Sequence, residues 1–222
     1  MLIRMMTHWQ HKSINYFYSY KGTGSQAGNP LFEISSFYPQ LDNYYPLLVG
    51  LFYSIPYAFS GLYMGQLTKT GNRKWLMVSV LVMLSCMQLG TGIIPSFAML
   101  ACFRFLHGAI SSAIDPMAYS LVSDIFPPEK RTTANSFLSA ANFLGIAISS
   151  MTIILIKKIG WQNSYKTMGA MGIGAATMMA LFIKEPIRNQ FDKVAAARGT
   201  EIDKESKTEE KKPFFEQLKM LF

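Results

Sequence analysis

Long apolar runs separated by short polar joints dominate the middle of the chain. The runs cover residues 44–67, 75–94, 96–123, 135–156 and 167–183. About 18 or more consecutive apolar residues are long enough to cross the core of a bilayer as a helix. These runs mostly lack the polar stripe at 3.6-residue spacing that marks a surface helix of a soluble protein. The pattern therefore predicts an all-α membrane protein, a multi-pass helical bundle over residues 44–186.

The two ends of the chain are polar. Residues 1–43 are aromatic, polar and glycine-containing, so we expect a polar N-terminal segment without a spanning helix. Residues 187–222 begin with a charged, lysine-rich stretch, which predicts a solvated linker. The chain then ends on an amphipathic turn with Phe214, Leu218 and Leu221 on one face. This turn is typical of a membrane-surface segment, although part of a longer helix would look the same.

The formal charge of +8 comes mostly from residues between and beyond the apolar runs. If the first run enters the membrane from outside, 14 Lys and Arg residues lie on the cytoplasmic side and six on the other. The positive-inside rule then places the C-terminal tail in the cytoplasm. This distribution indicates the lipid bilayer as a partner and no nucleic acid. It leaves open whether the membrane is the plasma membrane or an endomembrane.

The sequence contains no motif for enzyme chemistry. Cys86 and Cys102 lie inside apolar runs, and no cluster of residues has metal-ligand spacing. A nucleophile elbow, a phosphate loop and a paired-carboxylate site are all missing from the sequence. We therefore predict no enzyme activity, no catalytic residue, no metal and no cofactor.

The third run carries charged residues at membrane depth. One helical face, at i, i+4, i+7 and i+11, holds Arg104, Gly108, Ser111 and Asp115, and His107 flanks it. A charged side chain in the membrane costs roughly 2.5–3.5 kcal/mol on insertion scales unless it is paired or hydrated. This face should therefore point into the bundle or a water-filled cavity. Arg104 and Asp115 are roughly 16 Å apart along a helix, so each needs a partner on another helix.

Two interpretations of this charged face remain open. In the first, it binds a substrate or a proton: Arg104 attracts an anionic group, Asp115 acts as counter-ion or proton acceptor, and His107 titrates near neutral pH. In the second, the charges only hold helices together.

Two uncharged residues join the candidates for this binding face. Tyr57 belongs to an aromatic cluster with Tyr53 and Tyr63 in the first run, which lines a cavity or packs against lipid and neighbouring helices. Asn142 in the fourth run is a polar residue in a lipid environment, and we expect it to hydrogen-bond across helices.

The joint after the first run resembles the signature loop between the second and third helices of the major facilitator superfamily. The family pattern is a glycine, three residues, an aspartate, a basic residue and then a basic pair. Matches to it are Gly65, Leu67, Arg73 and Lys74. Lys69 stands where the family has its aspartate.

Other segments resemble the same family in the expected order. Arg104 and Gly108 fit the Arg-x-x-x-Gly pattern of the family's fourth helix, and Asp124 and Arg131 fit the Asp-x-Phe…Arg pattern that closes it. The Gly-Trp and Glu-Pro motifs around the fifth run are similar to the entry and exit of the sixth helix. The Asn-Arg-Lys run before the second run is similar to the spinster-type subgroup. The resemblance covers about residues 44–190.

The resemblance implies a partial N-terminal half of this fold, with five of its six helices: the five runs match helices two to six, and the family's first helix is missing. It implies transport of a small organic or lipid-like solute by alternating access. It also implies that Arg73 pairs with Asp124 at the membrane surface, where a general positive-inside anchor is the alternative. Alternating access needs two bundles, so we expect a fragment, a half that joins a second half, or a homodimer. A transport-inactive structural membrane subunit is the alternative function.

Overall fold

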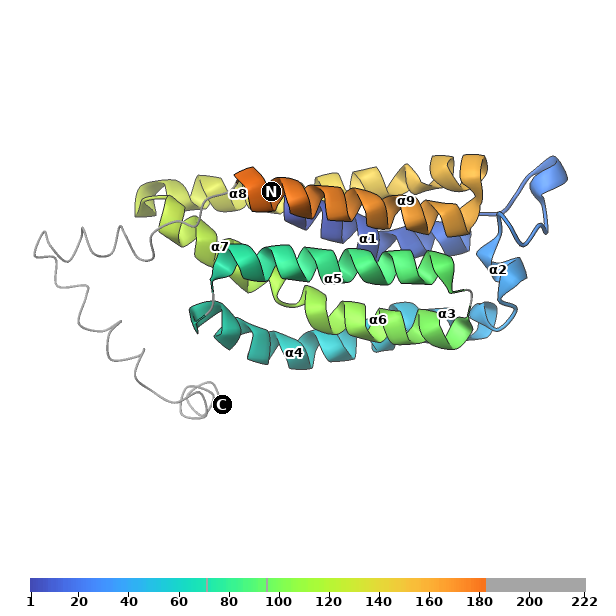
Figure 1. Cartoon of the computed structure of the whole chain (residues 1–222), viewed down its shortest axis with the longest axis horizontal. Helices are drawn as coiled ribbons and strands as arrows, with labels where there is room; N and C mark the ends of the chain where they lie inside the picture. Colours follow the sequence, from blue (N-terminus) through green and yellow to red (C-terminus); the bar gives the residue numbers. More distant parts are fainter. Residues whose placement is uncertain (71, 95, 183–222) are drawn as a thin grey trace, which may run out of the picture.

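The computed structural model describes residues 1–70, 72–94 and 96–182, with the backbone alone for residues 67–70. Every regular element in these residues is a helix. The elements are α1 (Leu2–Ser19), the 3-10 helix η1 (Gly24–Gln26), α2 (Ile34–Phe37), α3 (Leu41–Val49), α4 (Leu51–Thr70), α5 (Arg73–Ile93), α6 (Phe97–Ser111), α7 (Ile114–Ile125), α8 (Pro128–Ser150) and α9 (Thr152–Phe182). The long helices lie side by side in one elongated bundle (Figure 1). The predicted linker and amphipathic turn, residues 187–222, lie outside the described residues.

The predicted apolar runs correspond to helical stretches in the bundle. Three stretches are long and apolar enough to cross a membrane: Leu41–Gln66, Arg73–Ile93 and Phe97–Ile125. Helices α8 and α9 meet the same criteria together, as a pair bent by 58°. The predicted all-α membrane fold is therefore confirmed in the part of the chain that the structure describes.

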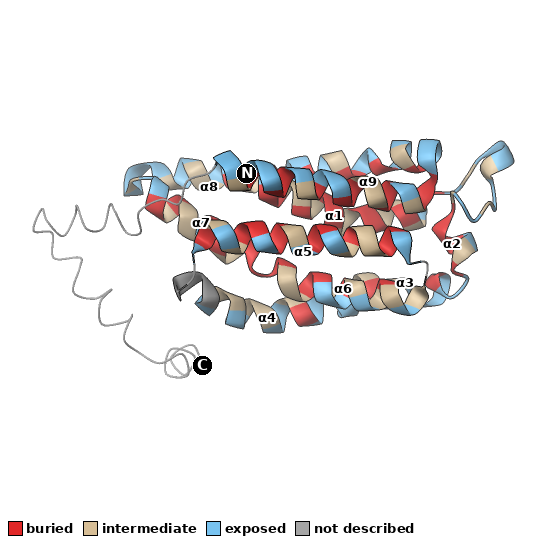
Figure 2. Cartoon of the chain, viewed as in Figure 1, coloured by how far each residue is buried: buried red, intermediate tan, exposed pale blue. Residues whose placement is uncertain are grey.

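The burial pattern separates the helices that form the core from those at the edge. Figure 2 shows continuous buried stripes along α1, α5 and α9, whereas α4 presents mostly exposed and partly buried residues. Exposed apolar side chains on α4 include Phe59 at 76% and Tyr63 at 65%. Helix α4 packs mainly on α6, so its other side is open to lipid or to another protein.

Helix α1 lies inside the bundle, although residues 1–43 were expected to form a polar segment ahead of it. It packs against α8, α9 and α5. Two of its polar side chains donate to those helices: Trp9 Nε1 donates to Thr152 Oγ1 at 3.0 Å, and Gln10 Nε2 donates to Ser85 Oγ at 3.2 Å. Because these groups are satisfied by neighbouring helices, α1 does not need the continuous apolar surface on which the sequence prediction relied.

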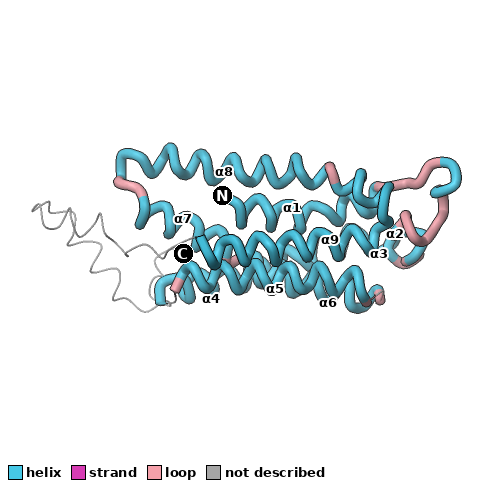
Figure 3. Tube along the Cα trace, turned by 45° about the horizontal axis from the view of Figure 1, so that its top comes forward, coloured by secondary structure: helices cyan, strands magenta, loops and turns pink. Residues whose placement is uncertain are grey.

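Residues 20–40 form a polar connection that covers one end of the bundle. Figure 3 shows this loop, with α2, at the same end as the turn within α9. That turn is at Gly160, whose backbone has φ 78° and ψ 167°. The next residue, Trp161, donates its backbone N–H to Leu31 O at 3.1 Å and its indole N–H to Pro30 O at 2.8 Å. The loop is therefore fixed to the turn by one main-chain hydrogen bond and one hydrogen bond from the Trp161 side chain.

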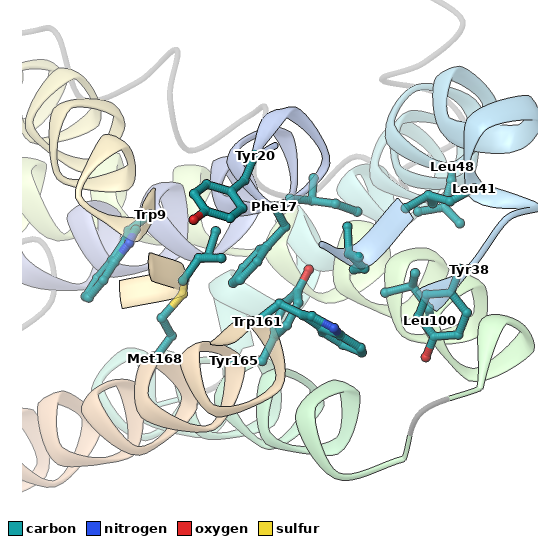
Figure 4. Close-up of a cluster of buried hydrophobic side chains, with 13 residues drawn as sticks. Trp9, Phe17, Tyr20, Tyr38, Leu41, Leu48, Leu100, Trp161, Tyr165 and Met168 are labelled. Atoms are coloured by element: carbon teal, nitrogen blue, oxygen red, sulfur yellow. The ribbon is translucent and has the colours of Figure 1, made fainter. Parts of the chain in front are cut away.

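An aromatic cluster lies beneath this loop. Figure 4 shows Phe17, Trp161 and Tyr165 in a cluster with Tyr38, which follows α2, and Leu41 at the start of α3. Phe17 stacks on Tyr165 with ring centroids 4.1 Å apart. Because the cluster joins α1, the loop and α9, it closes this end of the bundle by burial of apolar surface.

Replacement of Gly160 by alanine should destabilise the protein. A Cβ there would lie 2.6 Å from Leu31 O, and the positive φ is unfavourable for any residue with a side chain. The expected loss is about 2 kcal/mol in the free energy of unfolding, measured by tryptophan fluorescence on heating in detergent. Gly174→Ala is the matched control, because a Cβ there meets nothing within 4 Å. Equal stability of the two variants would contradict this account.

Glu33 should make the loop sensitive to acid. Its Oε1 accepts the Gly22 N–H at 2.6 Å and its Oε2 accepts the Ser36 hydroxyl at 2.9 Å. The Gly22 N–H lowers the pKa of Glu33 below its usual value. The carboxylate therefore adds stability at neutral pH, and this stability is lost as pH falls through the lowered pKa. We expect Glu33→Gln to lower the melting temperature at pH 7 and to differ less from the parent protein at acidic pH.

Candidate functional site

A partly buried ion pair joins α1 to α7. Arg4 Nη2 donates to Asp115 Oδ1 at 2.5 Å, and Arg4 Nη1 donates to Leu138 O on α8 at 3.4 Å. The Arg4 side chain is 3% exposed, while that of Asp115 is 39% exposed. The second oxygen of Asp115 accepts the Tyr57 hydroxyl from α4 at 3.0 Å. The pair and its hydrogen bonds thus join four helices, α1, α4, α7 and α8, and the Asp115 side chain remains partly exposed.

Asp115 owes its position to a break between α6 and α7. Residues Ser112 and Ala113 interrupt the helix, so that Asp115 lies in the first turn of α7. The N-terminus of a helix favours a carboxylate because its free N–H groups carry partial positive charge. On the α4 side, Ser60 Oγ lies 2.5 Å from Pro56 O of its own helix, 2.7 Å from Ala109 O and 2.9 Å from Ser112 Oγ. The Ser60 hydroxyl of α4 therefore packs against the interrupted backbone.

A cavity of about 220 Å³ opens beside the Asp115 carboxylate. Its lining residues are Thr7, His8, His11, Lys12, Tyr53, Tyr57, Ser111, Ile114 and Asp115. We call this space the polar cavity. It lies between α1, α4 and the α6–α7 break, and every lining side chain except Ile114 carries a hydrogen-bonding group. Such a cavity suits a small polar solute.

Stacked rings form one wall of the polar cavity. The His11 ring lies 3.9 Å from the Tyr53 ring at an interplanar angle of 28°, and His107 lies 6.3 Å from His11 behind it. Tyr53 also shares a 3.0 Å hydrogen bond with Ser111. His107 is 2% exposed, and neither ring nitrogen has a hydrogen-bond partner among the described residues. His107 therefore supports the wall from within the bundle and does not line the cavity.

Arg104 is a second buried guanidinium close to this wall. It is 4% exposed. Its Nη1 donates to His11 O at 3.4 Å, and its Nη2 donates to the Tyr165 hydroxyl at 3.5 Å. Both acceptors are neutral, and the described residues place no carboxylate on Arg104. Its positive charge therefore remains uncompensated next to the polar cavity.

The structure gathers most of the predicted binding face but not all of it. Ser111, Asp115 and Tyr57 line the polar cavity, and Arg104 and His107 lie behind it. Gly108 allows α4 to approach α6, because a Cβ there would overlap the Tyr53 carbonyl oxygen.

Asn142 is the member of the predicted face that lies elsewhere. It is on α8 and does not line the polar cavity. The hydrogen bond expected for it is not found either, since its buried Oδ1 has no partner within the described ranges. The polarity of a single side chain in an apolar run therefore did not indicate a cross-helix contact.

Five residues of the site were missed in the sequence because they lie on α1. They are Arg4, Thr7, His8, His11 and Lys12. A signal was present: Arg4, His8 and His11 recur at i, i+4 and i+7, the spacing of one helical face. This is the spacing that identified the face of α6, and it did not depend on a long apolar run.

A larger cavity of about 880 Å³ lies near the ends of α7, α8 and α9. Its walls are almost entirely apolar, and Lys130 is the one charged side chain among the described residues that line it. It offers few groups to orient a polar solute, so the smaller polar cavity is the better candidate site.

A second buried ion pair lies at the opposite end of α7. Arg73, at the start of α5, donates to Asp124, and also to Ser120 O at 3.2 Å. Asp124 is 2% exposed and Arg73 is 8% exposed. The pairing that the family resemblance implied is therefore present. We call Arg73 and Asp124 the Arg–Asp latch.

The other residues of the signature loop surround this latch. Arg131 donates to Ser123 O at 2.9 Å and to Phe126 O at 3.2 Å, which ties the start of α8 to the end of α7. The Lys74 ammonium lies 5.3 Å from the centre of the Trp75 ring. Gly65 is on α4. The side chain of Lys69 lies outside the described residues.

The sequence matches the family model of the major facilitator superfamily over residues 29–222. The chain belongs to this superfamily. The predicted family is thereby confirmed, and the protein is an integral membrane protein of a transporter family. In chain order, α1 precedes the five stretches that match family helices two to six.

Two curated relatives and two solved structures share this similarity. The probable galactarate/D-glucarate transporter GudP of Bacillus subtilis (strain 168) is 31% identical over 140 residues, 58% of this chain and 30% of the relative. The uncharacterized MFS-type transporter YfhI of the same strain is 30% identical over 113 residues, 49% and 28% of the two chains. This chain thus spans less than a third of either relative.

The solved structures are those of a bacterial homologue of the human lysosomal transporter Spinster, in inward-facing unoccupied and occupied conformations. Both align with a TM-score of 0.66 at 19% identity. They cover 84% and 86% of this chain, and 42% and 44% of the solved chains. At this identity the likeness concerns the fold, and it matches the spinster-type resemblance of the signature loop.

Loss of the Arg–Asp latch should destabilise the bundle. Asp124→Asn removes the counter-ion of a buried arginine, and an uncompensated buried charge costs roughly 3–5 kcal/mol in the free energy of unfolding. Denaturation in detergent measures the effect, with Asp42→Asn as control because Asp42 is exposed. A double variant, Arg73→Asp with Asp124→Arg, should recover part of the stability. If Asp124→Asn is as stable as the parent protein, the pair is not a latch.

Proposed function

We propose that this chain forms the N-terminal half of a major facilitator superfamily transporter that moves a small organic anion by alternating access. The polar cavity, next to two buried arginines, is the observation that carries this proposal. Arg4 and Arg104 lie beside the cavity, and Asp115 is the one carboxylate that the described residues provide for both. Lys12 adds a further positive charge to the lining. An anionic solute would compensate this excess.

The name of one relative supports the same substrate class. GudP is named a probable galactarate/D-glucarate transporter, and both of these sugar acids carry two carboxylates. A guanidinium binds a carboxylate through parallel N–H···O bonds, which gives specificity as well as affinity. D-Glucarate is therefore a suitable first probe, and a lipid-like solute is the alternative within the transporter proposal.

Alternating access requires a second bundle, and α4 offers a surface for one. Its exposed apolar residues Phe59 and Tyr63 lie on the side away from α6. This face would be covered by a second half of the transporter, on the same chain or on another, or by a second copy of this chain. In the membrane, the excess of Lys and Arg on one side favours a cytoplasmic C-terminal tail.

A transport-inactive structural subunit is the second candidate function. Lys69, at the position where the family has an aspartate, favours it. A purely structural role gives no reason to retain an uncompensated Arg104 inside the bundle.

Uptake of labelled D-glucarate by cells that produce the protein tests the proposal. We expect Arg104→Ala to lower the initial uptake rate about tenfold or more, because the buried positive charge is lost. Phe105→Ala is the control, since this neighbour on the same helix is 48% exposed. Arg104→Lys should retain part of the activity.

The mass of the native protein in membranes completes this test. A species well above the 25.0 kDa of this chain would indicate a second half on the same polypeptide. A 25.0 kDa species that takes up none of a panel of anionic and neutral solutes would favour the structural subunit.

A further inference from the structure

Asp115 occupies the place that a carboxylate ligand would take on Arg4. Its Oδ1 contacts Arg4 Nη2, and the described contacts show no second bond between the two groups. Arg4 Nε is buried and has no hydrogen-bond partner. A guanidinium can donate five hydrogen bonds and pairs best with a carboxylate through two of them. The Asp115 carboxylate therefore holds Arg4 but uses only part of the hydrogen-bonding capacity of its guanidinium group.

Asp115 is also placed so that it can leave this position. Its side chain is 39% exposed, whereas Arg4 is 3% exposed. Asp115 lines the polar cavity, and Arg4 lies behind it. The remaining contact of the Asp115 carboxylate is a neutral phenol, the Tyr57 hydroxyl at 3.0 Å. Lys12 and His8 line the same cavity and offer a displaced Asp115 other polar partners.

We propose that Arg4 is a carboxylate-binding subsite and that Asp115 is an internal competitor which an incoming substrate carboxylate displaces. This inference rests on the proposed transport function and adds to it a specific binding partner. A solute without a carboxylate cannot replace Asp115 on Arg4. The exchange would therefore select solutes by the presence of this group and would keep Arg4 paired in both the empty and the occupied state.

Binding of three six-carbon probes tests the exchange. D-Glucarate, D-gluconate and D-glucitol carry two, one and no carboxylates on similar carbon chains. The full chain in lipid nanodiscs should bind D-glucarate or D-gluconate more tightly than D-glucitol, as measured by calorimetry. Asp115→Asn should raise the affinity for the acids by about tenfold, because Arg4 no longer has a competitor, and should leave D-glucitol unchanged. A gain of affinity cannot arise from misfolding.

Two charge-matched double variants separate direct binding from a general electrostatic effect. Lys12→Gln with Asp115→Asn retains Arg4, and Arg4→Gln with Asp115→Asn retains Lys12, so both have the same net charge. We expect the first to keep most of the gain in affinity for the acids and the second to lose all of it. Equal affinities in the two double variants would overturn the proposal, as would an Asp115→Asn variant that binds the acids no better than the parent protein.

Failure of this inference is distinguishable from failure of the proposed transport function. Uptake of a neutral solute that depends on Arg104, without binding of either acid, would retain the transporter and overturn the carboxylate exchange. Tighter binding of both acids by Asp115→Asn, with retention of the gain in the variant that keeps Arg4, would support the exchange even if uptake requires a second half.

Discussion

The bundle depends on the requirement that a charged side chain removed from water must have a partner. Arg4 and Asp115 meet this requirement together, and their pair determines how α1 is held. Helix α1 is too polar to be kept in the membrane by its apolar surface, and it remains there because its polar groups are bonded to α5, α7, α8 and α9. Asp115 in turn would lack a cation without α1. The first helix and the polar cavity therefore depend on each other.

The same requirement applies to the backbone where the helices are irregular. The break between α6 and α7 leaves main-chain groups outside the regular hydrogen-bond pattern, and the Ser60 hydroxyl on α4 accommodates it. At the far end of the bundle, the turn at Gly160 is stabilised by the loop through the N–H groups of Trp161. Irregular backbone within a membrane is stable only where such partners exist. The break can therefore position Asp115 without unfolding the helix.

Sequence patterns predicted the features that a single segment determines, but they missed most contacts between segments that lie far apart in the chain. Length and hydropathy were sufficient for the five apolar runs, and the family resemblance was sufficient for Arg73 and Asp124. Helix α1 was missed because its place depends on partners far away in the chain: Arg4 and Asp115 are 111 residues apart. The spacing of Asp115 from Arg104 indicated a shared helical face, but it did not indicate that the partner of Asp115 lies on α1. The break at Ser112 lies four residues before Pro116, which lacks the N–H that would bond to Ser112 O, but this signal was not used and one continuous helical face was expected.

Arg4 and Arg104 have different surroundings, and the difference suggests different roles in selecting a solute. Arg104 is held by a carbonyl and a phenol, so its charge remains and raises the potential of the cavity without directing a bond into it. This favours any anion. Arg4 is held by a carboxylate, so it adds little to the potential until Asp115 moves. A solute attracted by Arg104 would then have to place a carboxylate on Arg4 in the position that Asp115 occupies. Arg104 would thus attract anions and Arg4 would discriminate between them. A substitution at one of these arginines would then leave the role of the other in place.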